Sequence, residues 1–239
     1  MRRSFLLGVL TGLALGAYMR RTKQQGVTQT RLDDYYRRRA ASYHLTDYLF
    51  LGQFPRIEMR KKVVQMTGLK PGDTVLDFAC GTGSNYPYIM ERIGSTGRLV
   101  GVDYSPDMLR EAGKLVEQHG WKNVELVQSD AAEMKFKSQF DVVICTLGLA
   151  VIPRYEQAME RAMVALKPGG VFGVGDICES ERWYMRPFNF LTDFVDTFII
   201  ADSSRRPWEW MAAHGEDYRR EEIFLGYFYA ATVRKSKEK

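Results

Sequence analysis

Cysteine and histidine are scarce in this chain of 239 residues. The three cysteines, Cys80, Cys145 and Cys178, lie far apart and are odd in number, which argues against a disulfide framework. There is no C-x-x-C pair and no cluster of cysteine with histidine, so we expect no metal site. This cysteine usage indicates a reduced protein whose folded part faces the cytoplasm.

Long hydrophobic runs are also absent. The longest uncharged stretch, residues 4–19, has 16 residues and is flanked by arginine pairs. As a helix it would rise roughly 24 Å, short of the ~30 Å hydrocarbon core of a bilayer. It would span if the bilayer thins or the arginines snorkel, or it would insert without crossing. We therefore expect residues 1–24 to be a membrane-anchor helix with a basic flank. A cleaved signal peptide with a weak site at Ala14 and Gly16 is the alternative.

Three glycines of this stretch, Gly8, Gly12 and Gly16, recur every fourth residue and share one helix face. Such a face lets two helices approach closely, which would give a homo-oligomer. Glycine is also simply common in short membrane helices.

Positive charge is concentrated at the N-terminus. Residues 1–40 contain nine Lys/Arg and two Asp, so they carry +7 of a chain whose net charge is +5. The remaining residues therefore sum to −2. A slightly acidic body argues against nucleic-acid binding, and a basic arm predicts contact with an anionic membrane surface.

From about Pro55 onward, short β-rich runs alternate with helical stretches, which indicates a parallel sheet covered on both faces. We expect strands at 75–78, 98–103, 124–128, 140–146 and 171–176, helices at 86–93, 106–119 and 155–166, and a closing hairpin at 221–224 and 227–233. The predicted fold is α/β: a Rossmann-like, doubly wound, mostly parallel seven-stranded sheet with an N-terminal apolar membrane helix. Residues 25–58 would be a linker and substrate-side helix, and residues 59–239 the main domain.

A nucleotide cofactor is indicated where the first strand ends. Gly81 and Gly83 would let the backbone turn tightly and approach a ligand that a Cβ would exclude. Asp103 ends the second strand, where a carboxylate reaches ribose hydroxyls. A dinucleotide site has a third glycine three residues after the second, and this chain has Tyr86 at that position. The negative charge of Asp77 would favour a sulfonium and an ammonium over a pyrophosphate. These features favour S-adenosylmethionine over NAD.

Four motifs resemble those of class I S-adenosylmethionine-dependent methyltransferases. Residues 75–83 (Val-Leu-Asp-Phe-Ala-Cys-Gly-Thr-Gly) resemble the first motif, and residues 101–109 the second. Residues 129–131 (Ser-Asp-Ala) are similar to the adenine-contacting motif, and residues 166–170 to the turn before the fifth strand. The resemblance implies an enzyme with S-adenosylmethionine as cofactor. The implied cofactor residues are Asp77, Ala79, Gly81, Thr82, Gly83, Asp103, Tyr104, Met108, Asp130, Ala131 and Thr146.

Within that family the chain looks most like two branches, the quinone-biosynthesis C-methyltransferases and the bacterial phospholipid N-methyltransferases. In both, a Tyr-Asp pair before the domain lies over the active site; Tyr43 and His44 match it here. The resemblance therefore implies Tyr43 as a substrate and catalytic residue. His44 would be the base that a ring-carbon acceptor needs, although a structural role is the alternative.

The acceptor side is predicted in an apolar, aromatic insertion at residues 180–204. Arg205 and Arg206 follow it and would pair with a phosphate, unless they belong to a solvated turn. We expect methyl transfer at a membrane, in lipid metabolism, with an aminophospholipid headgroup favoured as acceptor. A quinone ring, a soluble small molecule and a degenerate, non-catalytic binding protein are the alternatives.

Overall fold

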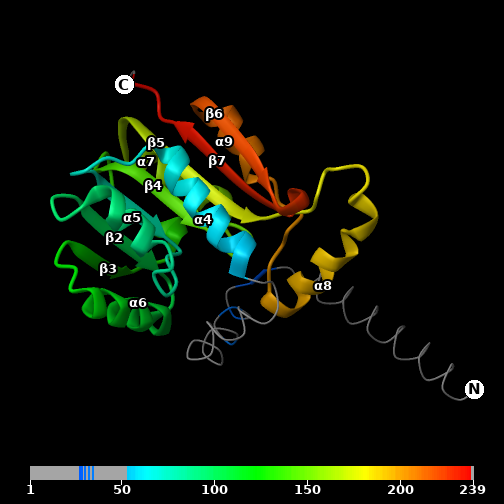
Figure 1. Cartoon of the computed structure of the whole chain (residues 1–239), viewed down its shortest axis with the longest axis horizontal. Coiled ribbons are helices and arrows are strands. Elements are labelled where there is room, and N and C mark those ends of the chain that lie inside the picture. The colour runs from blue at the N-terminus through cyan, green and yellow to red at the C-terminus, as the bar shows by residue number, and fades with distance from the viewer. Residues whose placement is uncertain (1–26, 29, 31, 33, 35–52, 238–239) are drawn as a thin grey trace, which may run out of the picture.

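The computed structural model describes residues 27, 28, 30, 32, 34 and 53–237. Seven strands form one sheet in the order β3-β2-β1-β4-β5-β7-β6, with β1 to β5 parallel and β7 antiparallel to both neighbours (Figure 1). The strands are β1 (Thr74–Phe78), β2 (Arg98–Asp103), β3 (Val124–Gln128), β4 (Phe140–Thr146), β5 (Leu166–Ile177), β6 (Glu216–Ile223) and β7 (Phe228–Arg234). The predicted Rossmann-like sheet is confirmed.

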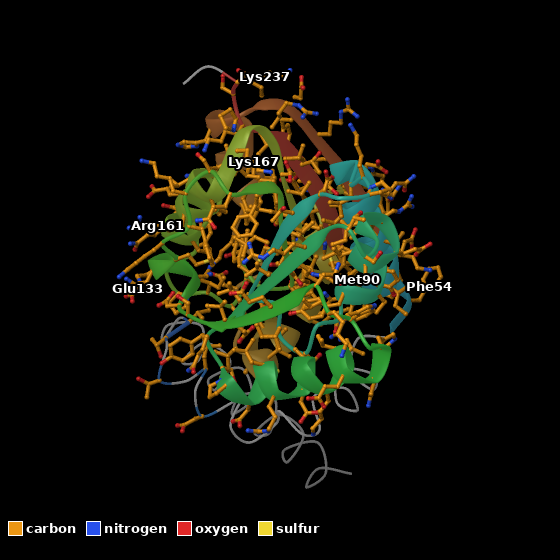
Figure 2. The ribbon with its side chains drawn as sticks, turned by 90° about the vertical axis from the view of Figure 1, so that its left-hand side faces the viewer. Phe54, Met90, Glu133, Arg161, Lys167 and Lys237 are labelled. Carbon is orange, nitrogen blue, oxygen red and sulfur yellow. The ribbon has the colours of Figure 1, made fainter. Side chains whose placement is uncertain are left out.

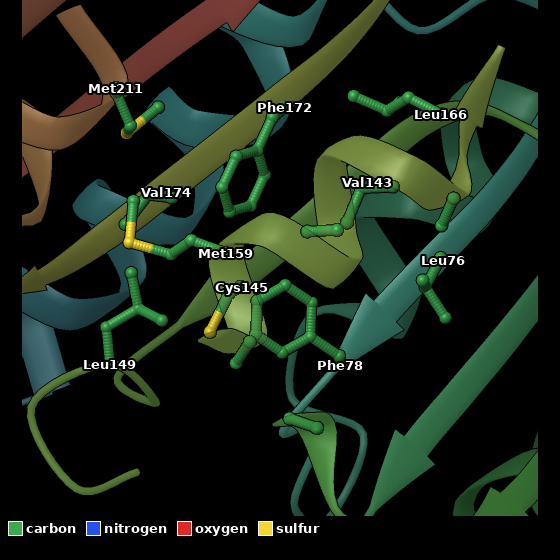
Figure 3. Packing of buried hydrophobic residues seen from close by; sticks show 14 of the residues in the cluster. Leu76, Phe78, Val143, Cys145, Leu149, Met159, Leu166, Phe172, Val174 and Met211 are labelled. Carbon is green, nitrogen blue, oxygen red and sulfur yellow. The ribbon is translucent and has the colours of Figure 1, made fainter. Parts of the chain in front are cut away.

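Helices cover both faces of the sheet. They are α4 (Gln53–Thr67), α5 (Tyr86–Ile93), α6 (Pro106–His119), α7 (Tyr155–Ala165), α8 (Phe190–Ile199) and α9 (Pro207–His214), with the short helices η2 (Ala131–Glu133), η3 (Arg186–Phe188) and η4 (Phe224–Gly226). Helices α4, α5 and α6 contribute to one buried cluster, and α7 and α9 to the cluster on the opposite face. Figure 3 shows part of the second cluster, where the rings of Phe78 and Phe172 lie with their centroids 6.0 Å apart.

Most charged side chains remain outside these layers; Arg56, Asp77 and Asp176 are the buried exceptions among the described residues. In Figure 2, Glu133 and Arg161 lie at the outer rim, while apolar side chains fill the space between the sheet and its helices. This is the distribution expected for a parallel sheet buried on both faces.

Helix α4 positions the site because it packs directly on β5 and β7. A Cβ added to Gly175 would lie 2.4 Å from the sulfur of Met59, and one added to Gly173 would lie 2.6 Å from a Thr67 side-chain carbon. The glycines therefore let the helix approach the sheet. Since Met59 lies beside Gly175 and Thr67 beside Gly173, α4 runs opposite to β5. Its N-terminal half consequently lies near the carboxyl ends of the parallel strands.

The structure departs from the sequence predictions at several places. Helix α4 runs through the predicted boundary between residues 58 and 59, and α9 was not predicted. The hairpin strands begin earlier for β6 and end one residue later for β7 than expected. None of the helices that the structure describes is long and apolar enough to cross a membrane. The predicted anchor at residues 4–19 lies outside the described residues.

Candidate cofactor and acceptor site

A pocket opens at the carboxyl ends of the parallel strands, with about 840 Å³ of space when the solvent at its mouth is included. This is the edge where open α/β sheets bind ligands. Nine of the predicted cofactor residues line it: Ala79, Gly81, Thr82, Asp103, Tyr104, Met108, Asp130, Ala131 and Thr146. Asp77 and Gly83 do not belong to the lining.

The loop after β1 turns tightly at Gly81. Its φ is +57°, in the left-handed region that favours glycine, and a Cβ there would meet no atom within 4 Å. Because Gly81 lines the pocket, that open space belongs to the pocket. A side chain at this position would therefore enter the volume that a ligand needs.

Gly83 is required for a different reason than the sequence indicated. A Cβ at Gly83 would lie 2.8 Å from the ring of Tyr86, not in the pocket. Tyr86, fully buried, stands where a dinucleotide site has its third glycine, and its hydroxyl enters the space left by Gly101 of β2. Helix α5 and strand β2 thus pack closely because Gly83 and Gly101 leave room for the Tyr86 side chain.

Asp103 is held by the loop that it faces. One carboxylate oxygen accepts from the Gly81 N–H at 2.8 Å and the other from the Ser105 N–H at 2.9 Å. Burial raises the pKa of Asp103, and these backbone bonds oppose the rise. Each oxygen keeps acceptor capacity after its backbone bond. The side chain is therefore suited to accept from two neighbouring hydroxyls, as ribose presents them.

Asp77 lies behind the pocket wall and is fully buried. Burial raises its pKa to about 7, while a hydrogen bond from Asn85 and the charge of Arg60 oppose the rise. The Asn85 amide donates to one oxygen at 2.9 Å, and the other oxygen has no hydrogen-bond partner among the described residues. A buried carboxylate with an unsatisfied oxygen fits a cationic ligand, because an ammonium would supply the missing donor.

Arg60 was not predicted as a site residue, yet it is the only cation among the described residues that line the pocket. It comes from α4, and its guanidinium donates to Asn85 Oδ1 at 2.8 Å and to the hydroxyl of Thr146. Thr146 in turn donates to Asn85 Oδ1 at 3.0 Å. Arg60 thus joins the polar network that includes Asp77. No motif identifies it; only the approach of α4 to the sheet does.

The other end of the pocket carries the residues expected around adenine. Asp130 caps η2 by accepting from Ala132 N at 2.8 Å, and its second oxygen pairs with Arg154 at 2.7 Å. Met108 is buried, whereas Tyr104 is exposed. Asp130 therefore has a capping role besides the predicted contact with the adenine amino group.

The acceptor residues predicted from sequence do not come together in the described residues. Arg205 donates to the backbone oxygens of Leu149 and Ile152, both at 2.6 Å, and so braces the loop after β4. Arg206 pairs with Glu181 and approaches Glu209 at 3.4 Å. Both arginines are engaged within the protein, which is a bracing role that the sequence did not reveal.

Tyr43 and His44 lie outside the described residues, so their predicted positions remain predictions. What the structure does place beside the cofactor pocket is an apolar lining that includes Leu32, Val151, Ile152 and Pro153. Leu32 is buried there although the residues on either side of it lie outside the described set. Leu32 therefore contributes to the lining from a position before α4.

Comparison with known proteins gives consistent matches. A family model described as a methyltransferase domain matches residues 69–207. The chain is 32% identical over 163 residues to the 2-phytyl-1,4-naphtoquinone methyltransferase of Nostoc, covering 67% of this chain and 69% of that protein. It is 39% identical over 113 residues to the demethylmenaquinone methyltransferase of Staphylococcus aureus, covering 47% of this chain and 46% of that protein. The match thus spans about half the length of the staphylococcal relative. An Aquifex aeolicus structure titled as a SAM-dependent methyltransferase aligns with a TM-score of 0.57 at 22% identity, over 73% of this chain and 88% of that one.

Proposed function

The chain belongs to the S-adenosylmethionine-dependent methyltransferases, and from that membership we propose that it methylates a ring carbon of a lipid-soluble quinol. The observation that carries the proposal is the kind of relative: the two proteins compared above are both named as quinone methyltransferases. The acceptor is thus the quinone alternative raised by the sequence rather than the aminophospholipid favoured there.

The residues of the pocket fit the cofactor at both ends. We propose that Asp103 receives the ribose hydroxyls, that Asp130 and Met108 contact the adenine, and that the open space at Gly81 admits the chain between them. Asp77 would balance the ammonium from behind the wall, and Arg60 would hold the carboxylate of the amino-acid end. Asn85 fixes the positions of Asp77 and Arg60 relative to each other, because it hydrogen-bonds to both side chains.

When bound, S-adenosylmethionine would supply a methyl group on a sulfonium: an acceptor atom would bond to the methyl carbon in line as the methyl–sulfur bond breaks, with S-adenosylhomocysteine as the leaving group. Such a displacement needs alignment and exclusion of water more than a nucleophilic side chain. The apolar wall of Leu32, Val151 and Ile152 can supply both for a flat ring. Asp176 holds the loop behind that wall by accepting from the Ala150 N–H at 3.0 Å.

For a quinol acceptor, the new bond joins the methyl group to a ring carbon, the methyl–sulfur bond breaks, and the ring carbon then loses a proton. A base is therefore useful, and we propose Tyr43 and His44 for the acceptor end. The described pocket lining contains no histidine, and its two carboxylates, Asp103 and Asp130, are those that we assign to the cofactor. The sequence prediction for His44 fits this need.

The engaged arginines further favour a ring over a phosphate. Binding a phospholipid headgroup with Arg205 would cost its two bonds to the loop after β4. Arg206 would have to leave Glu181. A quinol would leave the bonds of both arginines intact, because its ring carries no charge that an arginine would need to neutralise.

We further propose that the protein works at a membrane, with its catalytic domain facing the cytoplasm. Support comes from the uncharged residues 4–19 and the +7 charge of residues 1–40. Pairing through Gly8, Gly12 and Gly16 would make it a homo-oligomer, and no nucleic acid is a partner.

The proposal is tested by incubating the purified full chain and labelled cofactor with total membrane lipid, followed by chromatography of the labelled product. We expect label in the quinone fraction, and at least about tenfold less of it at limiting cofactor when Asp103→Ala replaces the wild type. Label confined to phospholipid or to water-soluble products would overturn the quinol assignment while leaving the methyltransferase activity intact.

A further inference from the structure

Large apolar side chains gather on the surface in two segments far apart in the chain. They come from the stretch before and at the start of α8, and from the turn between β6 and β7 (Figure 1). We call them the apolar tip: Trp183, Tyr184, Phe188, Phe190, Leu191, Phe224 and Leu225. Trp183 is 82% exposed and Phe190 60% exposed. Contiguous exposed aromatics of this size mark an interaction surface.

The two segments are held together by polar bonds beneath the apolar tip. Ser180 Oγ donates to Leu225 O at 2.8 Å, and Arg182 Nε donates to Glu222 at 3.0 Å. Tyr227 Oη donates to Met185 O at 3.3 Å. The apolar side chains are therefore presented together by a fixed framework rather than by independent loops.

The turn also places apolar residues where burial does not require them. Phe224 and Leu225 have φ of +47° and +58°, a region that non-glycine residues rarely adopt. A tight hairpin turn between β6 and β7 uses positive φ to match the twist of its strands. Both side chains remain about half exposed, so core packing does not require large apolar residues at these two positions.

The apolar tip lies on the pocket side of the molecule. Just after α8, Asp202 N donates to Ala150 O at 2.9 Å, and Ala150 adjoins the pocket-lining residue Val151. Leu32 lines the same pocket. Only twelve residues separate it from the uncharged segment that ends at residue 19, a length that reaches at most about 45 Å when extended. An apolar N-terminus and the apolar tip can therefore meet one surface.

The chemistry of the apolar tip suits a lipid surface. Tyrosine and tryptophan with nearby arginine are the residues that settle at a membrane interface. The acidic neighbours are neutralised within the protein, because Glu222 pairs with Arg182, and Glu181 with Arg220 at 3.1 Å. An anionic bilayer would thus meet no unpaired carboxylate from these two residues.

We propose that the apolar tip docks onto the bilayer and seats the mouth of the pocket against it. The tip is a second membrane contact, separate from the N-terminal segment. It lets a lipid-soluble acceptor pass from the bilayer to the pocket without crossing water. The docking itself is independent of which acceptor is methylated.

The test places an environment-sensitive fluorophore on the full chain through Phe224→Cys, with Val164→Cys as the matched control. Val164 is 43% exposed near the end of α7, and its backbone oxygen accepts from Ser138 N just before β4, at the amino ends of the parallel strands. The native cysteines are all buried and will label poorly. The probe is read on vesicles of phosphatidylcholine and phosphatidylglycerol whose acyl chains carry bromine as a quencher.

We expect the Phe224→Cys probe to shift to shorter wavelength and to be quenched, while the Val164→Cys probe stays water-like. A water-like Phe224→Cys probe overturns the proposal, whether or not the protein sediments with the vesicles. A shift that grows with protein concentration in the absence of vesicles would also overturn it, since it would assign the apolar tip to a second copy of this chain.

Activity gives a second readout. The double variant Phe224→Ser and Leu225→Ser, in the turn outside the predicted acceptor insertion, should reduce methylation of a vesicle-embedded acceptor by about tenfold or more. Its cofactor affinity and its activity on a short-chain, water-soluble analogue should stay unchanged. Equal activity on the embedded acceptor would contradict docking. Absence of activity on every quinol would contradict only the proposed acceptor, because the fluorescence result does not depend on it.

Discussion

Asp77→Asn separates what the buried carboxyl does for the cofactor from what it costs the fold. The side chain is fully buried, and its pKa is raised from 3.8 to about 7. A folded-state pKa above the unfolded value favours the protonated form in the folded state. The wild type therefore loses stability as pH rises from about 4 through 7, by roughly 4 kcal/mol in the limit of this shift.

The asparagine variant has no carboxyl to ionise, so it keeps its stability as pH rises. Its amide does add a hydrogen-bond donor, which costs about 1–3 kcal/mol if left unsatisfied. We expect the cofactor-free variant to be more stable than wild type by about 1–3 kcal/mol at pH 8, and less stable than it by about 1–3 kcal/mol near pH 4, where the wild-type carboxyl is protonated in the folded state. For a chain of this size, the melting temperature should rise by about 2–10 °C at pH 8.

Cofactor binding should change in the opposite direction. An ammonium needs the ionised form of Asp77, so wild-type affinity should fall about tenfold from its plateau near pH 7.5 to pH 6, and about a hundredfold by pH 5. The variant should bind the cofactor more weakly, and its affinity should depend less steeply on pH. The pH dependence that remains should come from Asp103, whose pKa is also raised. Calorimetric titrations and thermal melts across pH 4–8 measure both effects. A variant that is less stable than wild type at pH 8 and keeps the full pH slope would refute the reasoning.

Three further predictions concern the same pocket. Asp103→Ala removes charge-assisted bonds worth about 1.5–3 kcal/mol each, so cofactor affinity should fall at least about tenfold by calorimetry; unchanged affinity in a folded variant would remove it from the site. Gly81→Ala should weaken binding and, because its φ is +57°, should cost about 1–2 kcal/mol of stability, whereas Gly83→Val should lower the melting temperature further through contact with Tyr86; the reverse pattern would contradict the assignment of the two glycines. Arg60→Gln should weaken the cofactor by about 10- to 100-fold but should weaken a decarboxylated analogue less, and equal losses for the two ligands would exclude Arg60 as the carboxylate partner.

The sequence predicted most of the parallel strands well because β1, β2 and β4 are short, largely buried apolar runs. Strands 98–103, 124–128 and 140–146 and helices 86–93 and 106–119 match the structure residue for residue. Cofactor motifs could be placed for the same reason, since their residues follow strands whose ends meet at one edge. The family itself was predicted from those motifs and is confirmed.

Features that depend on packing between distant segments could not be predicted. Arg60 enters the pocket only because Gly173 and Gly175 let α4 lie close to β5. The Gly-x-Gly pattern of Gly81 and Gly83 did not indicate that Gly83 faces the Tyr86 ring rather than a ligand. Arg205 looked like a phosphate ligand because its carbonyl partners, more than fifty residues earlier, are invisible to local pattern.

The most direct test of the proposed function is the position of the transferred methyl group. The full chain would be given S-adenosylmethionine carrying ¹³C in its methyl group, with vesicles holding both a ring-unmethylated naphthoquinol with an isoprenoid tail and phosphatidylethanolamine. The account predicts a ¹³C-methyl on a ring carbon, and no label on nitrogen, in the carbon NMR spectrum of the extracted lipids. A labelled N-methyl headgroup with an unlabelled quinone would contradict it.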